Sequence, residues 1–514
     1  MNRTAPTVPM PAAESAVEPA SLSTPAGGWG ARAALAAVLL LCAVLSLSPY
    51  WAGYHRVWGE DDGWVHLKKV EGLLTLGPVG VMRVLYVREL SAHDHWRHPG
   101  MPPLLHILAA EGSYLVGLEW SFRLLPILVL LLAAQWLYRL ARTLGLGPAD
   151  AVIAAAFSAL SFEMVRQEGM RFLPQGLGVL LGIALIRSAY LLVQQEKPTL
   201  GRLVATALIA ALIPIGYGPM LFHIGGVIGL ALLAELWFTR RPFRALAFVP
   251  AAMGVGCALA LPFMLRVSYR PAHFSEYFVP ISNGGRLAAL SDVVKYPVLI
   301  GPVLVVLALA GMPRVAAGCR QRQPWAIWLV SWLLFLAPQT VVWVFAVPGP
   351  PFRLLVLLIP GVAIVGAIGL REILSKLHGT ERTAVWLGVS AVVVTALITA
   401  ALLAKVEIPR RWISDGEIAM YERAEQLGPG ATVYVPTTAM AWYFLRDRVA
   451  VRDTASLVSG SHSEAGTYWL ISDREWTEDA KLRPAYEAVV RNGHVVFAQQ
   501  GSRIVEVDRA VPLF

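Results

Sequence analysis

The sequence predicts an all-α polytopic membrane bundle of about eleven transmembrane helices, with interfacial helices in the first outer loop and a small C-terminal α/β domain outside the membrane. Composition leads to this fold class. Of the 514 residues, 56% are hydrophobic and only 15% are charged, whereas about 25% are charged in a typical soluble domain. The mean hydropathy is +0.58. A soluble fold could not keep so much apolar surface from water, so we expect an integral membrane protein.

The N-terminal part divides at the first apolar run. Residues 1–30 are rich in Pro, Ala, Ser and Thr and show no period, which predicts a disordered cytoplasmic tail. Residues 31–404 carry the apolar runs of a transmembrane module. The first run, residues 33–51, is long enough to span and has no evident small-residue cleavage site, so we expect it to remain as the first transmembrane helix.

Further apolar runs follow along the module. A span needs about 20 mostly apolar residues, and the runs approach or reach this length. Together with the first, they make up the expected spans. They are residues 121–140, 151–165, 176–193, 203–215, 220–238, 245–265, 298–311, 325–347, 354–370 and 384–403.

Loop charge decides the role of the ambiguous run 101–118, which carries His106 and Glu111. If this run lies at the interface, all basic loop clusters fall on one side of the membrane, whereas counting it as a span would invert every later loop. The positive-inside rule therefore favours a cytoplasmic N-terminus and a C-terminus outside, and it explains the net charge of +9 without nucleic acid. The clusters are Arg139/Arg142, Lys197/Arg202, Arg240/Arg241/Arg244, Arg314/Arg320/Arg322 and Arg371/Lys376/Arg382.

Residues 405–514 have the composition of a soluble domain. Four segments, 431–436, 467–472, 494–499 and 502–507, are predicted strands. Two segments, 415–426 and 476–491, are predicted helices. Their alternation along the chain predicts a small α/β domain on the outer side.

The first outer loop, residues 53–119, is dense in ionisable groups. Glu60, Asp61 and Asp62 come just after the first span. From Asp62 on, the apolar residues fit one face of a short amphipathic helix, which would lie on the membrane surface. Such an acidic group could bind a divalent cation or act as a base. It could equally cap the N-terminus of the helix, and the residues alone favour neither reading.

Three more polar clusters lie on the same predicted side. Residues 91–104 hold three histidines with Asp94, but their spacing matches no zinc motif, and the prolines favour an irregular loop. Residues 163–175 hold Arg166 and Arg171, which suit a phosphate or a salt-bridged helix end. Residues 215–219 form a glycine-containing hairpin. Because all the clusters map to one side, we expect a polar cavity at the outer interface.

The order of these motifs resembles the GT-C superfamily of polytopic glycosyltransferases, which includes protein O-mannosyltransferases, aminoarabinose transferases and oligosaccharyltransferases. Asp62-Gly-Trp-Val-His66-Leu is similar to the string that follows the first span in the oligosaccharyltransferase branch. His98-Pro-Gly-Met-Pro-Pro-Leu104 and the hairpin Gly216-Tyr217-Gly218-Pro219 occupy the places of two other family motifs. Two positions depart from the family pattern. Gln175 stands near the expected second acidic residue, which Glu168 or Glu163 would have to replace, and Tyr217 stands in place of a hairpin lysine.

The resemblance implies transfer of a sugar from a polyprenyl-phosphate donor to a glycan, lipid or protein acceptor, with no nucleic-acid partner. Asp62 would be the general base, together with Asp61. A divalent metal, Mg²⁺ or Mn²⁺, on Asp61 and Asp62 is left open. The donor phosphate would be bound by Arg171, Arg166, His98 and Tyr217, and the substrate or metal would be supported by Glu60, His66 and Glu168.

Two other function classes compete with this reading. A multispan secondary transporter would need charged or broken helices near the middle of the membrane, and few mid-span ionisable groups are present. A membrane scaffold with an outer binding domain would not need the dense first loop. The compact loops and the lack of an organelle signal favour a bacterial inner membrane, with the C-terminal domain in the periplasm.

Overall fold

The computed structural model describes twelve stretches of the chain. They are residues 27–51, 61–83, 104–195, 197–263, 294–342, 351–377, 381–407, 413–435, 444–445, 448–454, 462–473 and 482–513.

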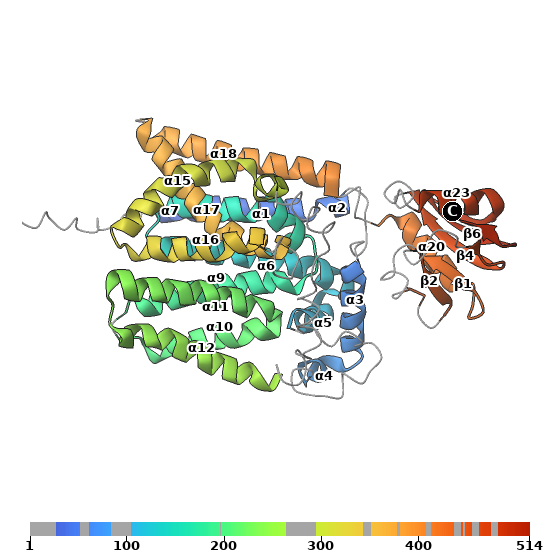
Figure 1. Cartoon of the computed structure of the whole chain (residues 1–514), viewed down its shortest axis with the longest axis horizontal. Coiled ribbons are helices and arrows are strands. Elements are labelled where there is room, and N and C mark those ends of the chain that lie inside the picture. Colours follow the sequence, from blue (N-terminus) through green and yellow to red (C-terminus); the bar gives the residue numbers. More distant parts are fainter. Residues whose placement is uncertain are drawn as a thin grey trace, which may run out of the picture.

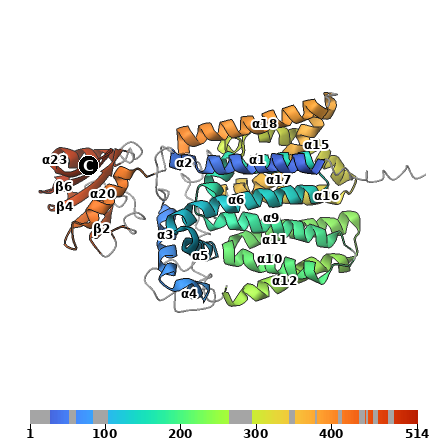
Figure 2. The ribbon, with the colours of Figure 1, turned by 180° about the vertical axis from the view of Figure 1, so that it is seen from behind.

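Long helices lie side by side and form the bundle seen in Figures 1 and 2. Several begin with proline, including α7, α9, α11 and α15, because proline fits the first helical turn, where no backbone donor is needed. The helices are α1 (Gly27–Ser46), α6 (Leu118–Thr143), α7 (Pro148–Ala159), α9 (Pro174–Val193), α10 (Leu200–Tyr217), α11 (Pro219–Ala234), α12 (Phe243–Phe263), α15 (Pro302–Arg320), α16 (Pro324–Val342), α17 (Pro351–Lys376) and α18 (Glu381–Leu402).

The expected spans all fall on these helices. Within the described residues, nine helices are long and apolar enough to cross a membrane. A tenth span is formed if α7 is joined with the segment Phe162–Gly169, which is bent by 59° from it. The remaining predicted span falls on α16, whose 19 residues include no charged side chain. Large apolar side chains such as Leu208, Trp237 and Leu397 are exposed on the outside of the bundle, as a lipid-facing surface requires. The predicted membrane-bundle fold class is confirmed.

Close helix contacts hold parts of this bundle together. Helices α15 and α17 approach each other at Gly311 and Gly369, where an added Cβ would collide with the backbone of the facing helix. Small residues allow such backbone contact in membranes, where packing rather than water exclusion drives helix association. The α15–α17 pair is therefore sensitive to side-chain size at these two positions.

Short helices cover one end of the bundle, which we call the α3 end (Figure 1). They are α2 (Ser48–Trp51), α3 (Asp61–Leu74), α4 (Gly77–Arg83) and α5 (Leu104–Val116). Helix α3 runs across the ends of the long helices and buries Leu67, Val70 and Leu73. Helix α5 has 13 residues and is too short to be a candidate span, as expected for run 101–118.

The loops that carry the basic clusters lie at the opposite end of the bundle, which we call the basic end (Figure 1). They are the α6–α7, α9–α10, α11–α12, α15–α16 and α17–α18 connections. The separation of basic loops from the α3 end is the asymmetry that the loop-charge argument requires.

The C-terminal residues form a mixed sheet beyond the α3 end (Figure 1). The strand order is β2-β1-β4-β6-β5, with β1 parallel to β2 and β4, and β6 antiparallel to β4 and β5. Trp469, Tyr434 and Tyr486 are buried in its core. The elements are α20 (Asp415–Glu425), β1 (Thr432–Val435), β2 (Ala450–Asp453), β3 (His462–Ser463), β4 (Thr467–Ser472), α23 (Arg483–Asn492), β5 (His494–Gln499), β6 (Ser502–Val507) and β7 (Val511–Pro512).

The predicted α/β character of this part is confirmed. Strands β4, β5 and β6 have the predicted bounds, and α20 begins at Asp415 as expected. Its N-cap residue Ser414 forms a capping box with Glu417, which explains why the helix begins there. The predicted helix 476–491 is observed as α23, and residues 474–481 lie outside the described residues. Strands β2, β3 and β7 were not predicted.

Candidate functional site

A π-helical turn carries the centre of the polar site. The segment η3 (Val165–Gly169) follows α8 (Phe162–Met164) and precedes α9 at the α3 end. Glu163, Arg166, Gln167 and Glu168 are all buried there. π turns within helices often occur at functional sites, because they re-aim side chains that a regular helix would space differently.

Glu163 is held by its neighbours. Arg166 donates from Nε to Oε2 of Glu163 at 3.0 Å and from Nη2 to Oε1 at 2.8 Å. Gln167 Nε2 donates to Oε1 of the same carboxylate at 3.2 Å. This two-pronged pair compensates both buried charges. Glu163 and one edge of the Arg166 guanidinium therefore have a structural role.

Glu168 has a different environment. Its Oε1 accepts a hydrogen bond from Nε2 of Gln175 at 2.9 Å. Its Oε2 is buried and, among the described residues, has no hydrogen-bond partner. An added Cβ at Gly176 would collide with this oxygen, so the glycine leaves the space that the carboxylate occupies. Glu168 therefore reaches the place near Gln175 where the family pattern has its second acidic residue.

Arg171 lies beside this carboxylate. Its side chain is buried, and Nη1 donates to Oε1 of Gln167 at 3.1 Å. The charge of Arg171 also acts on the Glu168 carboxyl group. The acceptor of this hydrogen bond is a neutral amide, whereas Arg166 donates to a carboxylate.

Aromatic contacts connect α3 to this segment. His66 of α3 and His106 of α5 are buried, with Nδ1 of His66 at 2.7 Å from Nε2 of His106. The ring of Phe172 lies 5.7 Å from each imidazole, centroid to centroid. It also stacks on Phe122 of α6 at 4.0 Å. The first-loop helix and the segment after η3 are thereby brought together, as the convergence of the polar clusters predicted.

The α10–α11 hairpin joins the same region from another side. Tyr217 is half-buried at the end of α10. An added Cβ at Gly178 of α9 would lie 3.1 Å from the Cβ of Tyr217. Because Gly178 is one helical turn after Gln175, the hairpin packs next to the Glu168–Gln175 pair.

The first-loop acids are only partly described. Asp61 and Asp62 form the first residues of α3, and their side chains lie outside the described part of the chain. Glu60 and His98 lie outside the described residues altogether. The assignment of these four residues thus stays a prediction.

Two buried ionisable residues of the first-loop helices were not among the predicted site residues. Lys69 of α3 is 1% exposed and His106 of α5 is fully buried. Spacing could have identified Lys69, because it is three residues after His66 and next to the apolar Val70 on the buried face of the helix. His106 has no such signal, since only the packing of α5 against α3 brings it to His66.

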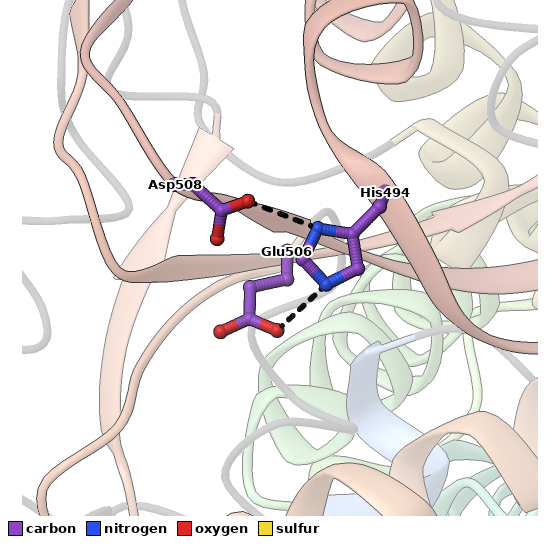
Figure 3. A group of neighbouring side chains, drawn as sticks. All are labelled: His494, Glu506 and Asp508. Atoms are coloured by element: carbon purple, nitrogen blue, oxygen red, sulfur yellow. Dashed lines mark ion pairs between the residues drawn. The ribbon is translucent and has the colours of Figure 1, made fainter.

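A second group of possible metal ligands lies on the C-terminal sheet (Figure 3). His494 Nε2 is 3.1 Å from Glu506 Oε2, and His494 Nδ1 is 3.2 Å from Asp508 Oδ2. The carboxylates thus take different nitrogens of one exposed imidazole. A single ion binds only one nitrogen of an imidazole, so these contacts describe surface ion pairs rather than a formed metal centre.

Comparisons with known proteins agree with this architecture. No family model matches the chain, and no curated protein matches its sequence. The apo oligosaccharyltransferase of Archaeoglobus fulgidus is similar in structure, with a TM-score of 0.61 at 13% identity over 87% of this chain and 70% of that chain.

Two further solved structures are similar over nearly the whole chain. ArnT from Cupriavidus metallidurans, bound to undecaprenyl phosphate, has a TM-score of 0.55 at 17% identity over 93% of this chain and 98% of that chain. Arabinofuranosyltransferase AftD from Mycobacteria has a TM-score of 0.54 at 15% identity and covers 93% of this chain, which spans 40% of AftD. Likeness at such low identity concerns the fold. The predicted resemblance is thus confirmed at the level of the fold, which the chain shares with these GT-C membrane glycosyltransferases.

Proposed function

We propose that this protein is a membrane glycosyltransferase that moves a sugar from a polyprenyl-phosphate donor to a glycan, lipid or protein acceptor. The observation that carries the proposal is the Glu168 carboxylate, which is buried at the α3 end with one oxygen left without a partner among the described residues. Uncompensated buried carboxylates are costly and are typical of functional sites. The GT-C fold and the contact between α3 and the Arg171 segment support the same conclusion.

The donor class is supported by the similar structures. ArnT was solved with undecaprenyl phosphate, and the archaeal oligosaccharyltransferase AglB with a dolichol-phosphate and an inhibitory peptide. A polyprenyl-phosphate donor also suits a site at one end of a membrane bundle, because the lipid presents the sugar at the interface. We infer that the α3 end faces the periplasm of a bacterial inner membrane, since the basic loops lie at the opposite end.

In the proposed reaction an acceptor nucleophile forms a bond to the anomeric carbon while the bond from that carbon to the phosphate oxygen breaks. The transition state resembles an oxocarbenium ion, as in glycoside hydrolysis. Asp62 would take the proton of the acceptor as general base. Position 62 is one helical turn before His66 on α3. The ring of His66 contacts His106 and Phe172, and these contacts would fix the part of α3 that carries the base.

The leaving group is a lipid phosphate, which needs positive charge rather than a proton. Arg171 suits this role better than Arg166, because Arg166 already donates twice to Glu163. Tyr217 of the adjacent hairpin would donate a hydrogen bond to the phosphate from its hydroxyl group. His98 of the first loop would donate one from its imidazole ring. In this scheme Glu163 and Arg166 form the support that keeps η3 in place.

We further propose that Glu168 would hold a divalent cation together with Asp61 and Asp62, whose side chains lie outside the described residues. The unpartnered oxygen of Glu168 and the acidic residues Asp61 and Asp62 are hard oxygen donors, which suit Mg²⁺ or Mn²⁺. When bound there, the ion would neutralise charge on the donor phosphate. Glu60 and His66 are the residues that would support such a group or the substrate.

The proposal is tested by donor turnover of the purified protein with a panel of undecaprenyl-phosphate sugars. Asp62→Asn keeps the size of the side chain but removes the base, so we expect turnover to fall by about 100-fold or more. The matched control is Glu71→Gln on the same helix, where the partly exposed carboxylate lies 3.5 Å from Nζ of Lys68. Unchanged turnover in Asp62→Asn, or an equal loss in the control, would show that the base is elsewhere.

A further inference from the structure

A histidine on α11 and a glutamine on α16 form a polar contact near the α3 end. Nδ1 of His223 lies 3.1 Å from Oε1 of Gln339. His223 is in the second turn of α11, and Gln339 is in the last turn of α16. Both turns belong to the α3 end of their helices (Figure 1). No step of the proposed reaction uses this pair.

The hydrogen bonds of Gln339 fix the protonation of the neutral imidazole. Gln339 Nε2 donates to the backbone carbonyl of Phe335 at 2.8 Å. A carbonyl oxygen can only accept, so the amide nitrogen must face Phe335 and the amide oxygen must face His223. That oxygen needs a donor, so Nδ1 of His223 carries the proton. The other ring nitrogen, Nε2, is then a hydrogen-bond acceptor.

The side chain of His223 is only partly covered by its neighbours. His223 is half-buried, and among the described residues its Nε2 has no hydrogen-bond partner. The neighbouring Phe222 is 71% exposed on the outside of the bundle, where hydrocarbon chains of a lipid can contact it. The site thus combines a polar acceptor with an exposed apolar side chain near the α3 end of α11.

The position of the pair relative to the candidate site limits what could reach it. Tyr217 and His223 belong to the same hairpin, and Met220 between them packs on Gly178 of α9. Gly178 is one turn from Gln175, which holds Glu168. A head group bound at Glu168 and Arg171 would therefore lie on the side of α9 to which the hairpin is attached.

We propose that Nε2 of His223 accepts a hydrogen bond from a hydroxyl of the donor sugar and so contributes to sugar recognition. The inference rests on the proposed function, because it takes the donor to be a lipid-linked sugar. A neutral imidazole nitrogen with a lone pair repels phosphate oxygens but accepts from hydroxyl groups, and a hydrocarbon chain offers it no donor. The sugar is the part of a polyprenyl-phosphate donor that carries hydroxyl groups.

Two substitutions separate recognition from structure. His223→Asn keeps a polar atom near Nδ1 and can preserve the contact with Gln339, but it has nothing at the place of Nε2. His223→Gln places an amide oxygen near Nε2 and gives up the contact with Gln339. Recognition predicts that the asparagine variant loses donor affinity and the glutamine variant retains more of it, whereas a purely structural role predicts the reverse order.

The test measures binding of undecaprenyl phosphate and of undecaprenyl phosphate linked to mannose, glucose or 4-amino-arabinose, for wild type and both variants in detergent. We expect His223→Asn to weaken binding of the preferred sugar lipid by about 5- to 10-fold, which is the loss of one hydrogen bond, with no change for the sugar-free lipid. A deoxy analogue that lacks the recognised hydroxyl should bind wild type more weakly by the same factor. His223→Asn should bind this analogue and the complete sugar lipid with equal affinity.

Each other outcome contradicts the inference in a recognisable way. Equal loss for the sugar lipid and the sugar-free lipid would assign His223 to the phosphate or to folding. Unchanged binding by His223→Asn would remove it from the site while leaving the proposed function intact. If wild type bound no sugar lipid more tightly than undecaprenyl phosphate, the proposed function itself would fail, and sugar recognition with it.

Discussion

At the scale of single residues, Glu163 and Glu168 differ in their partners although they are five positions apart on the same segment. Glu163 is bound by Arg166 and Gln167, whereas Glu168 has Gln175 on one oxygen and, within the described residues, no partner on the other. Removal of one partner of a buried ion pair is strongly destabilising, whereas a buried acidic group with an unsatisfied oxygen is typical of a functional site. The two residues should therefore respond differently to the same substitution.

Glutamine at each position tests this contrast. Glu163→Gln leaves Arg166 as a buried charge without its carboxylate, so we expect a loss of about 3 kcal/mol in the free energy of unfolding. Glu168→Gln keeps the size of the side chain but removes its acidic group, so we expect a melting temperature close to that of wild type and a fall in turnover of about 100-fold. Thermal unfolding in detergent and donor turnover measure the two effects. Full activity of Glu168→Gln would remove this residue from the site.

The sequence limits what could be predicted at this scale. It indicated the cluster 163–175 and left Glu163 and Glu168 as alternatives for the second acidic group. Which of the two is paired depends on the π turn. In this turn Arg166 contacts Glu163, and Glu168 contacts Gln175. No local pattern indicates that turn, which packs against α1, α6 and α9 in the folded bundle.

At the scale of elements, hydrophobic periodicity and loop charge were sufficient to locate most helices and strands. Helix α3 begins at Asp61, one residue before the predicted start, and strand β4 has the predicted bounds. The strands that were missed have weak signals. Strands β3 and β7 have two residues each, and β2 contains Arg452 and Asp453, so it lacks an alternating apolar face.

The contact between α15 and α17 gives a prediction at this scale. Gly369→Leu would push a side chain into the backbone of α15 at Leu307, so we expect a loss of about 3 kcal/mol in stability through overpacking. Gly229→Leu on α11 is the matched control, because nothing lies within 4 Å of a Cβ added there. The midpoints of thermal unfolding in detergent compare them. Equal midpoints would mean that the two helices can separate without cost.

At the scale of the whole molecule, charge asymmetry sets the expected orientation. The basic loops and the α3 end lie on opposite sides of the bundle, and the C-terminal sheet lies beyond the α3 end (Figure 1). The overall architecture followed from composition and loop charge, whereas the juxtaposition of α3 with the Arg171 segment needed tertiary structure. His106 shows why, since its partner His66 is 40 residues away in the chain.

Cysteine accessibility in intact cells tests this orientation. In a background in which Cys42, Cys257 and Cys319 are replaced, Asn492→Cys on the C-terminal domain should react with a membrane-impermeant maleimide. Gln321→Cys in the basic α15–α16 loop should react only after the cells are made permeable, because positive loops stay in the cytoplasm. The opposite pattern of labelling would invert the proposed topology.

The central claim is that a lipid phosphate loses its sugar at the α3 end of the bundle. The most direct measurement is release of undecaprenyl phosphate from undecaprenyl-phosphate sugars in proteoliposomes of known protein orientation, with acceptors of each class supplied. We expect wild type to release the lipid when donor and acceptor are on the side of the C-terminal domain, and Asp62→Asn to release at least about 100-fold less. Release that needs substrates on the side of the basic loops, or that persists undiminished in Asp62→Asn, would contradict the account.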